Sequence, residues 1–347
     1  MRIGVPKEIK VLEDRVGLTP ESVRELADHG HEVIVEHGAG QGIGMDNQDY
    51  VRAGATVAGA AREIFAAAEM IVKVKEPLAV ERAMLKPGQV LFTYLHLAPD
   101  PEQAADLVAS GAVCIAYETV TSASGGLPLL APMSEVAGRM AVQAGAHFLE
   151  KAHGGKGILL GGVPGVDPAK VVVLGGGVVG THSIHIALGM GAEVWVLDRS
   201  VDVLRRLWTQ FGRPLNTVFS TRDAIDRHVT NADLVIGGVL IPGASAPKLV
   251  SAAQIRKMKP GSVVVDGVTH YCVANMPGGV PRTSTFALNN ATLPFVLALA
   301  GKGWRKALSD DVHLRNGLNI AFGKVTCQPV AEALGYPHVS TESLLAA

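Results

Sequence analysis

The first feature that could do chemistry is a run of glycines directly after an apolar stretch. Residues 171–180 read VVVLGGGVVG, so Gly175, Gly177 and Gly180 follow a predicted buried strand and open a predicted helix. In such a turn the first glycine allows a tight bend, the second leaves room for a phosphate against bare backbone, and the third lets helix and strand pack closely. The helix N-terminus adds unpaired N–H groups and the positive end of a dipole. These features are typical of a pyrophosphate site.

An acidic residue follows eighteen positions after the last of these glycines. Asp198 ends the run EVWVLD, where its carboxylate could accept hydrogen bonds from both hydroxyls of a ribose and would repel a 2′-phosphate. Arg199 comes next, and we interpret it as a solvent-exposed charge. Strand, glycine turn, helix, second strand and terminal acid together predict dinucleotide binding, with NAD favoured over NADP.

Polar residues at the ends of other predicted strands suggest a second half of the site. Lys73 and Lys75 lie in KVKEP, where strand alternation would point both to one face. His96 follows LFTYL, and Arg15 lies in the loop EDRVGLTP before the first helix. Arginine suits bidentate recognition of a carboxylate, and a partly desolvated lysine can polarise a carbonyl oxygen. Histidine titrates near neutral pH and can transfer protons.

Each of these residues also has an ordinary structural explanation. A strand-end lysine is usually a solvated surface charge, and most of the twelve histidines are expected on the surface or in satisfied core positions. The predicted site therefore depends on Arg15, Lys75 and His96 converging beside a bound dinucleotide. His182 and His185 have an i, i+3 spacing that could hold a metal ion, but we interpret them as an exposed helix face. No metal is predicted.

Composition narrows the class of protein. The 347 residues carry a formal net charge of −1, and no basic run is long enough to indicate binding to nucleic acid or to an anionic membrane. No apolar run approaches the length of a membrane span, and the N-terminus lacks the apolar region of a signal peptide. Three scattered cysteines make neither a disulfide framework nor a metal cluster. We expect a cytoplasmic globular protein.

The predicted elements indicate an α/β fold. Strands and helices alternate over the first 120 residues and again after the glycine run, which predicts doubly wound parallel sheets with helices on both faces. Thr19 and Pro20 are expected to cap the first helix, and a long helix is expected over 132–151.

The same order of elements predicts two domains. The chain becomes helical again after residue 281, so we expect C-terminal helices that return to the first domain. The predicted architecture is two Rossmann-like domains with an interdomain cleft. Residues 1–130 and 282–347 would form the substrate (catalytic) domain, and residues 131–281 the NAD-binding domain.

Several long motifs give the chain a close resemblance to bacterial L-alanine dehydrogenases, which are relatives of the transhydrogenase NAD-binding subunit. They include IGVPKEIK, RVGLTP, IVKVKEP, LFTYLHLA, LPLLAPMSEVAGRM, ADLVIGGVLIPGA and ANMPGGVPRTST. The resemblance covers nearly the whole chain. It implies reversible oxidative deamination, in which L-alanine, NAD and water give pyruvate, ammonia and NADH. It also implies a homohexamer.

The resemblance assigns roles to individual residues. It implies that Arg15 binds the substrate carboxylate, that Lys75 hydrogen-bonds the pyruvate carbonyl or the alanine amine, and that His96 is the general acid/base. Met133 and Asn275 are expected near the substrate. The expected cofactor-binding residues are Ser134, Gly175, Gly177, Val178, Val179, Gly180, Asp198, Ser220, Val239, Leu240, Val273, Ala274, Asn275 and Met276.

One departure from the family pattern follows the strand SVVVD. Family members continue into an A-x-D-Q-G-G motif and a loop of roughly two dozen residues, whereas here Asp266 is followed directly by GVTHYCVANM. The aspartate of that motif, which the family uses beside the residue equivalent to His96 in proton transfer, is absent. Either the segment belongs to the protein and is missing from the printed sequence, or the protein lacks it.

Two further functions therefore stay open beside alanine dehydrogenase. The chain could be a transhydrogenase-like NAD-binding subunit, although such a subunit has no need of the amino-acid pocket that Arg15 and Lys75 predict. It could also be a catalytically silent NAD-binding protein if the segment after Asp266 is truly absent.

Overall fold

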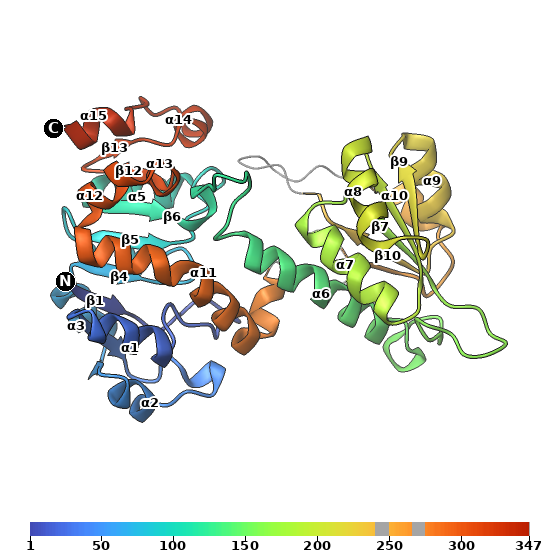
Figure 1. Ribbon diagram of the computed structural model, residues 1–347, viewed down its shortest axis with the longest axis horizontal. Coiled ribbons are helices and arrows are strands. Elements are labelled where there is room, and N and C mark those ends of the chain that lie inside the picture. The colour runs from blue at the N-terminus through green and yellow to red at the C-terminus, as the bar shows by residue number, and fades with distance from the viewer. Residues whose placement is uncertain (240–249, 266–274, 347) are drawn as a thin grey trace. The chain divides into compact units, whose positions relative to one another are not determined.

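Two separate sheets organise the chain. The computed structural model describes residues 1–239, 250–265 and 275–346. Unit 1 comprises Met1–Met133 and Gly278–Ala347, and unit 2 comprises Ser134–Pro277 (Figure 1). The chain passes from unit 1 to unit 2 in the first turn of helix α6 (Ala131–Phe148) and returns to unit 1 within the 3₁₀ turn η4 (Met276–Gly279).

Unit 1 contains an eight-stranded sheet in the order β13-β12-β6-β5-β4-β1-β2-β3. Its strands are β1 Arg2–Val5, β2 Glu32–Glu36, β3 Thr56–Ala58, β4 Met70–Val72, β5 Val90–Thr93, β6 Val113–Ala116, β12 Leu318–Ala321 and β13 Lys324–Val325. The six strands from β6 to β3 are parallel, as predicted. Strands β12 and β13 add an antiparallel edge that the sequence analysis did not predict. They are too short to show an alternating pattern.

Both faces of the unit 1 sheet are buried. On β5, for example, Val90 and Phe92 belong to one core cluster and Leu91 to another, as strand alternation requires. Helices α1 (Pro20–Asp28) and α11 (Pro281–Lys302) contribute to the first cluster. The other helices of the unit are α2 Asn47–Arg52, α3 Ala61–Ala67, α4 Ala79–Arg82, α5 Pro101–Ser110, α12 Trp304–Asp310, α13 Val312–Arg315, α14 Gln328–Leu334 and α15 Thr341–Ala346, with 3₁₀ turns at Gln41–Ile43 (η1) and Tyr117–Thr119 (η2).

The predicted start of the first helix is confirmed. The Thr19 side chain accepts a hydrogen bond from the Ser22 N–H, and Pro20 occupies the first helical turn. This cap satisfies an N–H group that has no partner within the helix.

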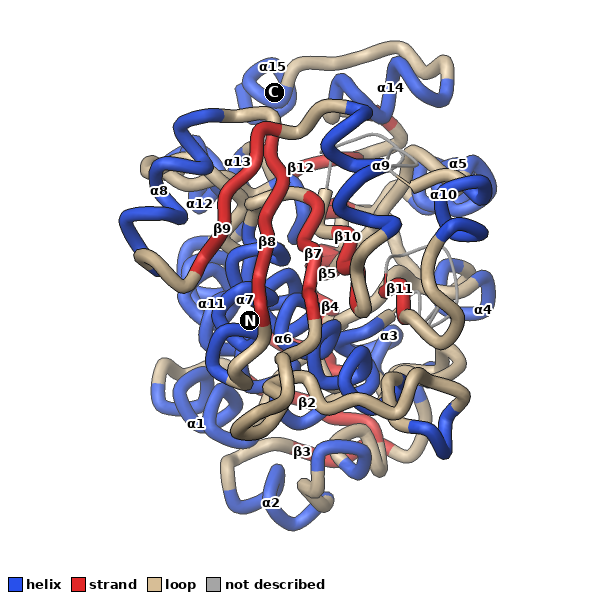
Figure 2. The backbone as a smooth tube through the Cα atoms, turned by 90° about the vertical axis from the view of Figure 1, so that its right-hand side faces the viewer, coloured by secondary structure: helices blue, strands red, loops and turns tan. Residues whose placement is uncertain are grey.

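Unit 2 has a five-stranded parallel sheet in the order β11-β10-β7-β8-β9. Figure 2 shows β9, β8 and β7 side by side. Its strands are β7 Lys170–Leu174, β8 Glu193–Asp198, β9 Leu215–Phe219, β10 Leu234–Gly237 and β11 Val263–Val265. The direction of strand order reverses between β7 and β10, and such a switch point is where open sheets bind ligands. Its remaining helices are α7 Val178–Gly189, α8 Val201–Phe211, α9 Arg222–Thr230 and α10 Ala252–Lys257, with 3₁₀ turns at Lys151–His153 (η3) and Met276–Gly279 (η4).

Helix α6 packs closely against the rest of unit 2. A Cβ atom at Gly138 would lie 2.3 Å from the Val179 carbonyl oxygen, and one at Gly145 would lie 2.6 Å from the Leu234 side chain. Glycine at these two positions therefore lets α6 approach both α7 and β10. Among the helices of the described residues, none is both long and apolar enough to cross a membrane.

Candidate active site

The glycine turn of unit 2 has the geometry that its sequence predicts. Gly175 has a φ of +97°, which disfavours any residue with a Cβ. A Cβ atom at Gly180 would lie 1.9 Å from the Gly175 carbonyl oxygen. A Cβ atom at Gly177 would meet only the Gly238 carbonyl oxygen, at 3.9 Å. The first glycine thus makes the turn, the third allows close packing, and the second faces open space.

The start of α7 can receive a phosphate group. Among the described residues no side chain caps this N-terminus, where Gly177 is the N-cap and Val178 and Val179 form the first turn. Backbone N–H groups and the helix dipole are therefore available to an anion. These residues fit the pyrophosphate of a dinucleotide.

Asp198 lies beside this turn at the carboxyl end of β8. Its Oδ2 accepts the Gly176 N–H at 2.7 Å and its Oδ1 accepts the Ser200 N–H at 2.7 Å. The Ser220 N–H donates to the Asp198 carbonyl oxygen at 2.9 Å, which places Ser220 next to it at the end of β9. Each carboxylate oxygen retains a lone pair for a ribose hydroxyl.

The other predicted cofactor residues are only partly described. Val239 follows β10 and reaches the glycine turn, since its Cγ2 would lie 2.7 Å from a Cβ atom at Gly175. Ser134 lies in the first turn of α6, and Asn275 and Met276 lie at the start of η4. Leu240, Val273 and Ala274 lie outside the described residues.

Gly180→Ala tests the importance of the close packing in this turn. We expect the added methyl group to displace α7 from β7, to destabilise the protein by about 1–3 kcal/mol and to weaken NADH binding at least tenfold. Gly189→Ala is the matched control, because Gly189 ends the same helix and a Cβ atom there would meet nothing within 4 Å. NADH fluorescence titration and thermal denaturation of both variants measure the difference. Equal NADH affinity in the two variants would contradict this account of Gly180.

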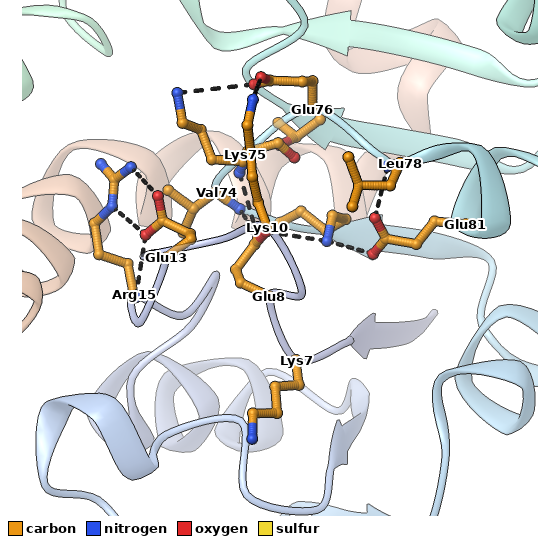
Figure 3. A network of polar contacts seen from close by, with 12 residues as sticks. Lys7, Glu8, Lys10, Glu13, Arg15, Val74, Lys75, Glu76, Leu78 and Glu81 are labelled. Atoms are coloured by element: carbon orange, nitrogen blue, oxygen red, sulfur yellow. Dashed lines mark hydrogen bonds and ion pairs between the residues drawn. The ribbon is translucent and has the colours of Figure 1, made fainter. Parts of the chain in front are cut away.

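In unit 1, Arg15 is held rigidly in a buried position. Only 2% of its side chain is exposed, and its Nε and Nη2 atoms donate to the two carboxylate oxygens of Glu13, both at 2.6 Å (Figure 3). Its Nη1 lies 3.0 Å from the Met133 sulfur. This arrangement brings two of the predicted substrate-binding residues together and fixes the plane of the guanidinium group.

The prediction that Lys73 and Lys75 share a strand face is wrong. Strand β4 ends at Val72 and the chain bends at residues 74–75, so strand alternation does not continue. Lys73 is fully buried between Glu8 and Glu81, with Nζ–Oε distances of 3.2 and 2.5 Å. Lys75 remains partly exposed, and its Nζ lies 3.8 Å from Glu76 Oε2 (Figure 3). Lys73 thus forms buried ion pairs within the fold, whereas the ammonium group of Lys75 remains partly accessible to a substrate.

His96 has an unusual backbone conformation. Its φ is +48°, in the left-handed region that non-glycine residues rarely adopt. The Glu118 carboxylate accepts the N–H of His96 at 2.6 Å and that of Leu95 at 3.2 Å, which holds this turn at the end of β5. The imidazole stacks on Tyr94 with ring centroids 5.7 Å apart and keeps 45% of its surface exposed. A strained residue held by neighbouring groups is a common feature of functional sites.

Glu76 links His96 to Lys75. Its Oε2 lies 3.8 Å from His96 Nδ1 and 3.8 Å from Lys75 Nζ, and its carboxylate also pairs with Lys10. Burial raises the pKa of Glu76, but the nearby His96 ring and the charges of Lys75 and Lys10 outweigh burial and hold this pKa well below its ordinary value. Burial lowers the pKa of Lys75, and the positive charges of Arg15 and Lys10 add to that effect while Glu76 opposes it.

The unit 1 cluster can therefore bind an anion and move protons. A carboxylate would meet Arg15 and Lys75, and His96 stands beside them as a titratable group. The carboxylates that position these groups, namely Glu13, Glu76 and Glu118, were not predicted from the sequence. Glu118 lies two residues after the end of β6, so the search for polar residues at strand ends that pointed to His96 could also have found it.

The two helical histidines of unit 2 differ in their surroundings. His185 is exposed, as expected. His182 is half-buried against α6: Arg139 Nε donates to its Nδ1 at 3.2 Å, and its Nε2 lies 3.9 Å from Glu135. The expectation of an exposed face is therefore wrong for His182, because the close approach of α6 covers it. Within the described part of the chain these two histidines belong to no group of three possible metal ligands.

Comparison with known families covers almost the entire chain. The model of the alanine dehydrogenase/PNT N-terminal domain matches residues 4–137, and that of the C-terminal domain matches residues 141–266 and 266–328. The chain belongs to the alanine dehydrogenase/PNT family. Membership of this family implies a nicotinamide cofactor, which agrees with the glycine turn of unit 2.

Individual relatives are similar to this chain over nearly its full length. The alanine dehydrogenase of Halomonas elongata is 55% identical over 370 residues, with 99% of this chain and 100% of that protein covered. A solved L-alanine dehydrogenase structure has a TM-score of 0.91 and 46% identity, with 96% of this chain and 99% of that one covered. The transhydrogenase structure from Sinorhizobium meliloti has a TM-score of 0.81 at 24% identity, with coverage of 94% and 100%, and shows the fold alone.

The same comparisons locate a gap in this member of the alanine dehydrogenase/PNT family. The 370 aligned residues exceed the 347 of this chain, so at least 23 positions of the Halomonas protein have no counterpart here. The two matches to the C-terminal domain model meet at residue 266. The aspartate-bearing segment of the family pattern is missing from the sequence at this same position.

Proposed function

We propose that this chain catalyses the reversible, NAD-dependent oxidative deamination of L-alanine to pyruvate and ammonia. The full-length identity to alanine dehydrogenases carries this proposal, and it reaches 55% over 99% of the chain. The cluster around Arg15, Lys75 and His96 supplies the matching chemistry. The transhydrogenase-like alternative has weaker support, because the solved transhydrogenase structure shares 24% sequence identity with this chain.

NAD is the proposed form of the nicotinamide cofactor. The glycine turn and the first turn of α7 would bind its pyrophosphate, and Asp198 would bind the ribose hydroxyls of the adenosine half. The Asp198 carboxylate lies at the carboxyl end of β8, and both of its oxygens accept backbone N–H groups. A 2′-phosphate on the ribose would place further negative charge beside this carboxylate and would be repelled. Bound NAD would supply the acceptor for the hydride that leaves the α-carbon of alanine.

Three residues of unit 1 would act on the substrate. Arg15, held flat by Glu13, would bind the substrate carboxylate through its guanidinium group. Lys75 would hydrogen-bond the carbonyl oxygen of pyruvate or the amine of alanine and stabilise negative charge at that oxygen. His96 would take and return the protons that the amine and the added water exchange. Met133, whose sulfur contacts the Arg15 guanidinium group, would lie beside the bound substrate.

The proposed reaction is tested by NADH absorbance with the natural protein, whose mass is determined as described below. We expect NADH oxidation that requires both pyruvate and ammonia, and equal stoichiometry of the two. NADH binding without turnover at any pH would favour the catalytically silent alternative. Hydride transfer only in the presence of a second protein would favour the transhydrogenase-like alternative.

The mass of the intact protein separates the two explanations of the gap. The printed sequence corresponds to 36.2 kDa. We expect the measured mass to exceed this value by the mass of about two dozen residues, because the sequence on both sides of Asp266 keeps the motifs of the dinucleotide-binding unit. A mass equal to that of the printed sequence would show that the protein lacks the segment.

The pH dependence of turnover tests the role of Lys75. Its ammonium form acts below its pKa, so activity is lost as pH rises through that pKa, which burial has lowered. Glu76→Gln removes an anion that raises the pKa of Lys75, and the alkaline limb of kcat/KM for pyruvate is expected to move to lower pH. Lys10→Met removes a cation that lowers this pKa, and the limb is expected to move to higher pH. Shifts of the same sign in both variants would contradict the assignment of this limb to Lys75.

A homohexamer in the cytoplasm is the proposed state of the protein, on the family resemblance alone. Size-exclusion chromatography with light scattering tests the assembly. The proposed partners are L-alanine, pyruvate and ammonia, with neither nucleic acid nor membrane, as the near-neutral charge indicates.

A further inference from the structure

A group of three possible metal ligands lies outside the candidate active site. His147, Glu150 and His153 present ligand atoms that all lie within 4.8 Å of one another. The Nδ1 of His147 is 3.9 Å from Glu150 Oε1, and the Nε2 of His153 is 3.7 Å from Glu150 Oε2. The two imidazole rings lie side by side with centroids 3.7 Å apart. The carboxylate thus has one oxygen directed to each ring.

The backbone at the end of α6 holds these three side chains in place. His147 lies in the last turn of the helix, where the Glu150 N–H donates to its carbonyl oxygen at 3.2 Å. The Glu150 carbonyl oxygen in turn accepts the N–H groups of His153 and Gly155, both at 3.1 Å. A Cβ atom at Gly155 would lie 2.3 Å from the Phe148 carbonyl oxygen, so the chain folds back tightly onto the helix. The spacing of the three ligands is therefore set by the turn.

The location separates this group from the proposed chemistry. Ser134 and His147 are thirteen residues apart on one helix, which corresponds to about 20 Å. Gly145, which lies two residues before His147, packs against Leu234 at the start of β10. This end of α6 therefore lies near the amino ends of the parallel strands. The glycine turn and Asp198 lie at the carboxyl ends of these strands. A ligand on this group would not compete with the dinucleotide.

The ligand types indicate the class of metal. Two imidazoles and a carboxylate suit Zn²⁺, Ni²⁺ or Cu²⁺, whereas Mg²⁺ and Ca²⁺ prefer sets made only of oxygen. Tetrahedral coordination with bonds of 2.0–2.1 Å needs ligand atoms about 3.3 Å apart. The three ligand atoms now lie within 4.8 Å of one another, so the exposed side chains need to close by at most about 1.5 Å, which rotation of their side chains can supply. The C-terminal end of α6 also favours a cation through the helix dipole.

We propose that His147, Glu150 and His153 form a binding site for a divalent transition-metal ion, with Zn²⁺ as the probe that tests it. The ion takes two nitrogen ligands and one oxygen ligand from the protein, and water completes its coordination. Because the metal binds the folded turn and joins its two ends, it stabilises the end of α6 by mass action. The proposal does not depend on the proposed alanine chemistry.

Equilibrium dialysis of the full chain against ZnCl₂, followed by elemental analysis, tests the site. The wild-type protein, stripped with a chelator, is expected to bind one Zn²⁺ that His147→Ala and His153→Ala each weaken at least tenfold, and that Glu150→Gln weakens less. His185→Ala is the matched control, because it removes an exposed histidine elsewhere in unit 2. Saturating Zn²⁺ is expected to raise the Tm of the wild type and of the control by about 2–4 °C and to leave the double variant His147→Ala/His153→Ala unchanged.

Two results would overturn the proposal. One is the absence of bound metal on the wild-type chain in Zn²⁺, Ni²⁺ and Cu²⁺. The other is a double variant that binds Zn²⁺ as tightly as the wild type, which would place the ion at another group such as His96 and Glu76. All three ligands are exposed, so the variants are expected to fold, and circular dichroism spectra that match the wild type confirm that they do.

Discussion

His96→Ala is expected to lower kcat by about 10²–10⁴-fold while the affinity for NADH stays within twofold of the wild type. The imidazole lies beside Lys75 and Glu76 in unit 1, whereas the glycine turn and Asp198 lie in unit 2. Removing the ring therefore removes the proposed general acid/base and leaves the proposed cofactor contacts intact. Stopped-flow measurement of NADH oxidation in the presence of pyruvate and ammonia gives kcat, and fluorescence titration gives the NADH affinity.

The backbone of His96 calls for a second variant. At a φ of +48° an alanine is strained, so part of the loss in His96→Ala could come from a displaced turn. Asparagine tolerates the left-handed region better and cannot act as a general base, so His96→Asn keeps the turn and removes the chemistry. We expect the same loss of kcat in both variants. Turnover that survives in His96→Asn would show that His96 has a structural role and that another group transfers the proton.

The sequence predicted unit 2 more fully than the site of unit 1. The glycine turn and Asp198 are recognisable because each residue acts through a local property: positive φ at Gly175, close packing at Gly180, and a strand-end carboxylate at Asp198. These properties depend on neighbours within one strand–helix–strand unit. Local pattern is therefore sufficient to place them.

The cluster of unit 1 depends on contacts between residues far apart in the chain. Strand alternation put Lys73 and Lys75 on one face, but the actual difference between them comes from Glu8 and Glu81, which no local pattern connects to Lys73. The left-handed conformation of His96 is likewise held by Glu118, twenty-two residues away. Such pairings become visible only after the sheet has brought the strand ends together.

Lys73→Met is expected to destabilise unit 1 by about 3–5 kcal/mol, because it leaves two buried carboxylates without their cation. Burial lowers the pKa of Lys73, but Glu8 and Glu81 more than offset this and hold it above its ordinary value, so the ammonium form is the one that unit 1 contains. Lys306→Met is the matched control, since Lys306 is exposed and pairs with Asp310 at the surface. Urea denaturation of both variants measures the difference, and a nearly unchanged stability is expected for the control.

This substitution is also expected to reduce turnover, because the buried ions support the proposed substrate site. Glu8 Oε1 accepts the backbone N–H groups of Val74 and Lys75 at 2.7 and 3.3 Å (Figure 3). Lys73 neutralises that carboxylate. Replacing all three ions, as in Lys73→Met/Glu8→Gln/Glu81→Gln, removes the uncompensated charges, while the amide oxygen introduced by Glu8→Gln can still accept those N–H groups. The triple variant should therefore regain most of the stability that the single variant loses. A triple variant as unstable as Lys73→Met would mean that the volume of the side chains, rather than their charge, determines the stability of this part of unit 1.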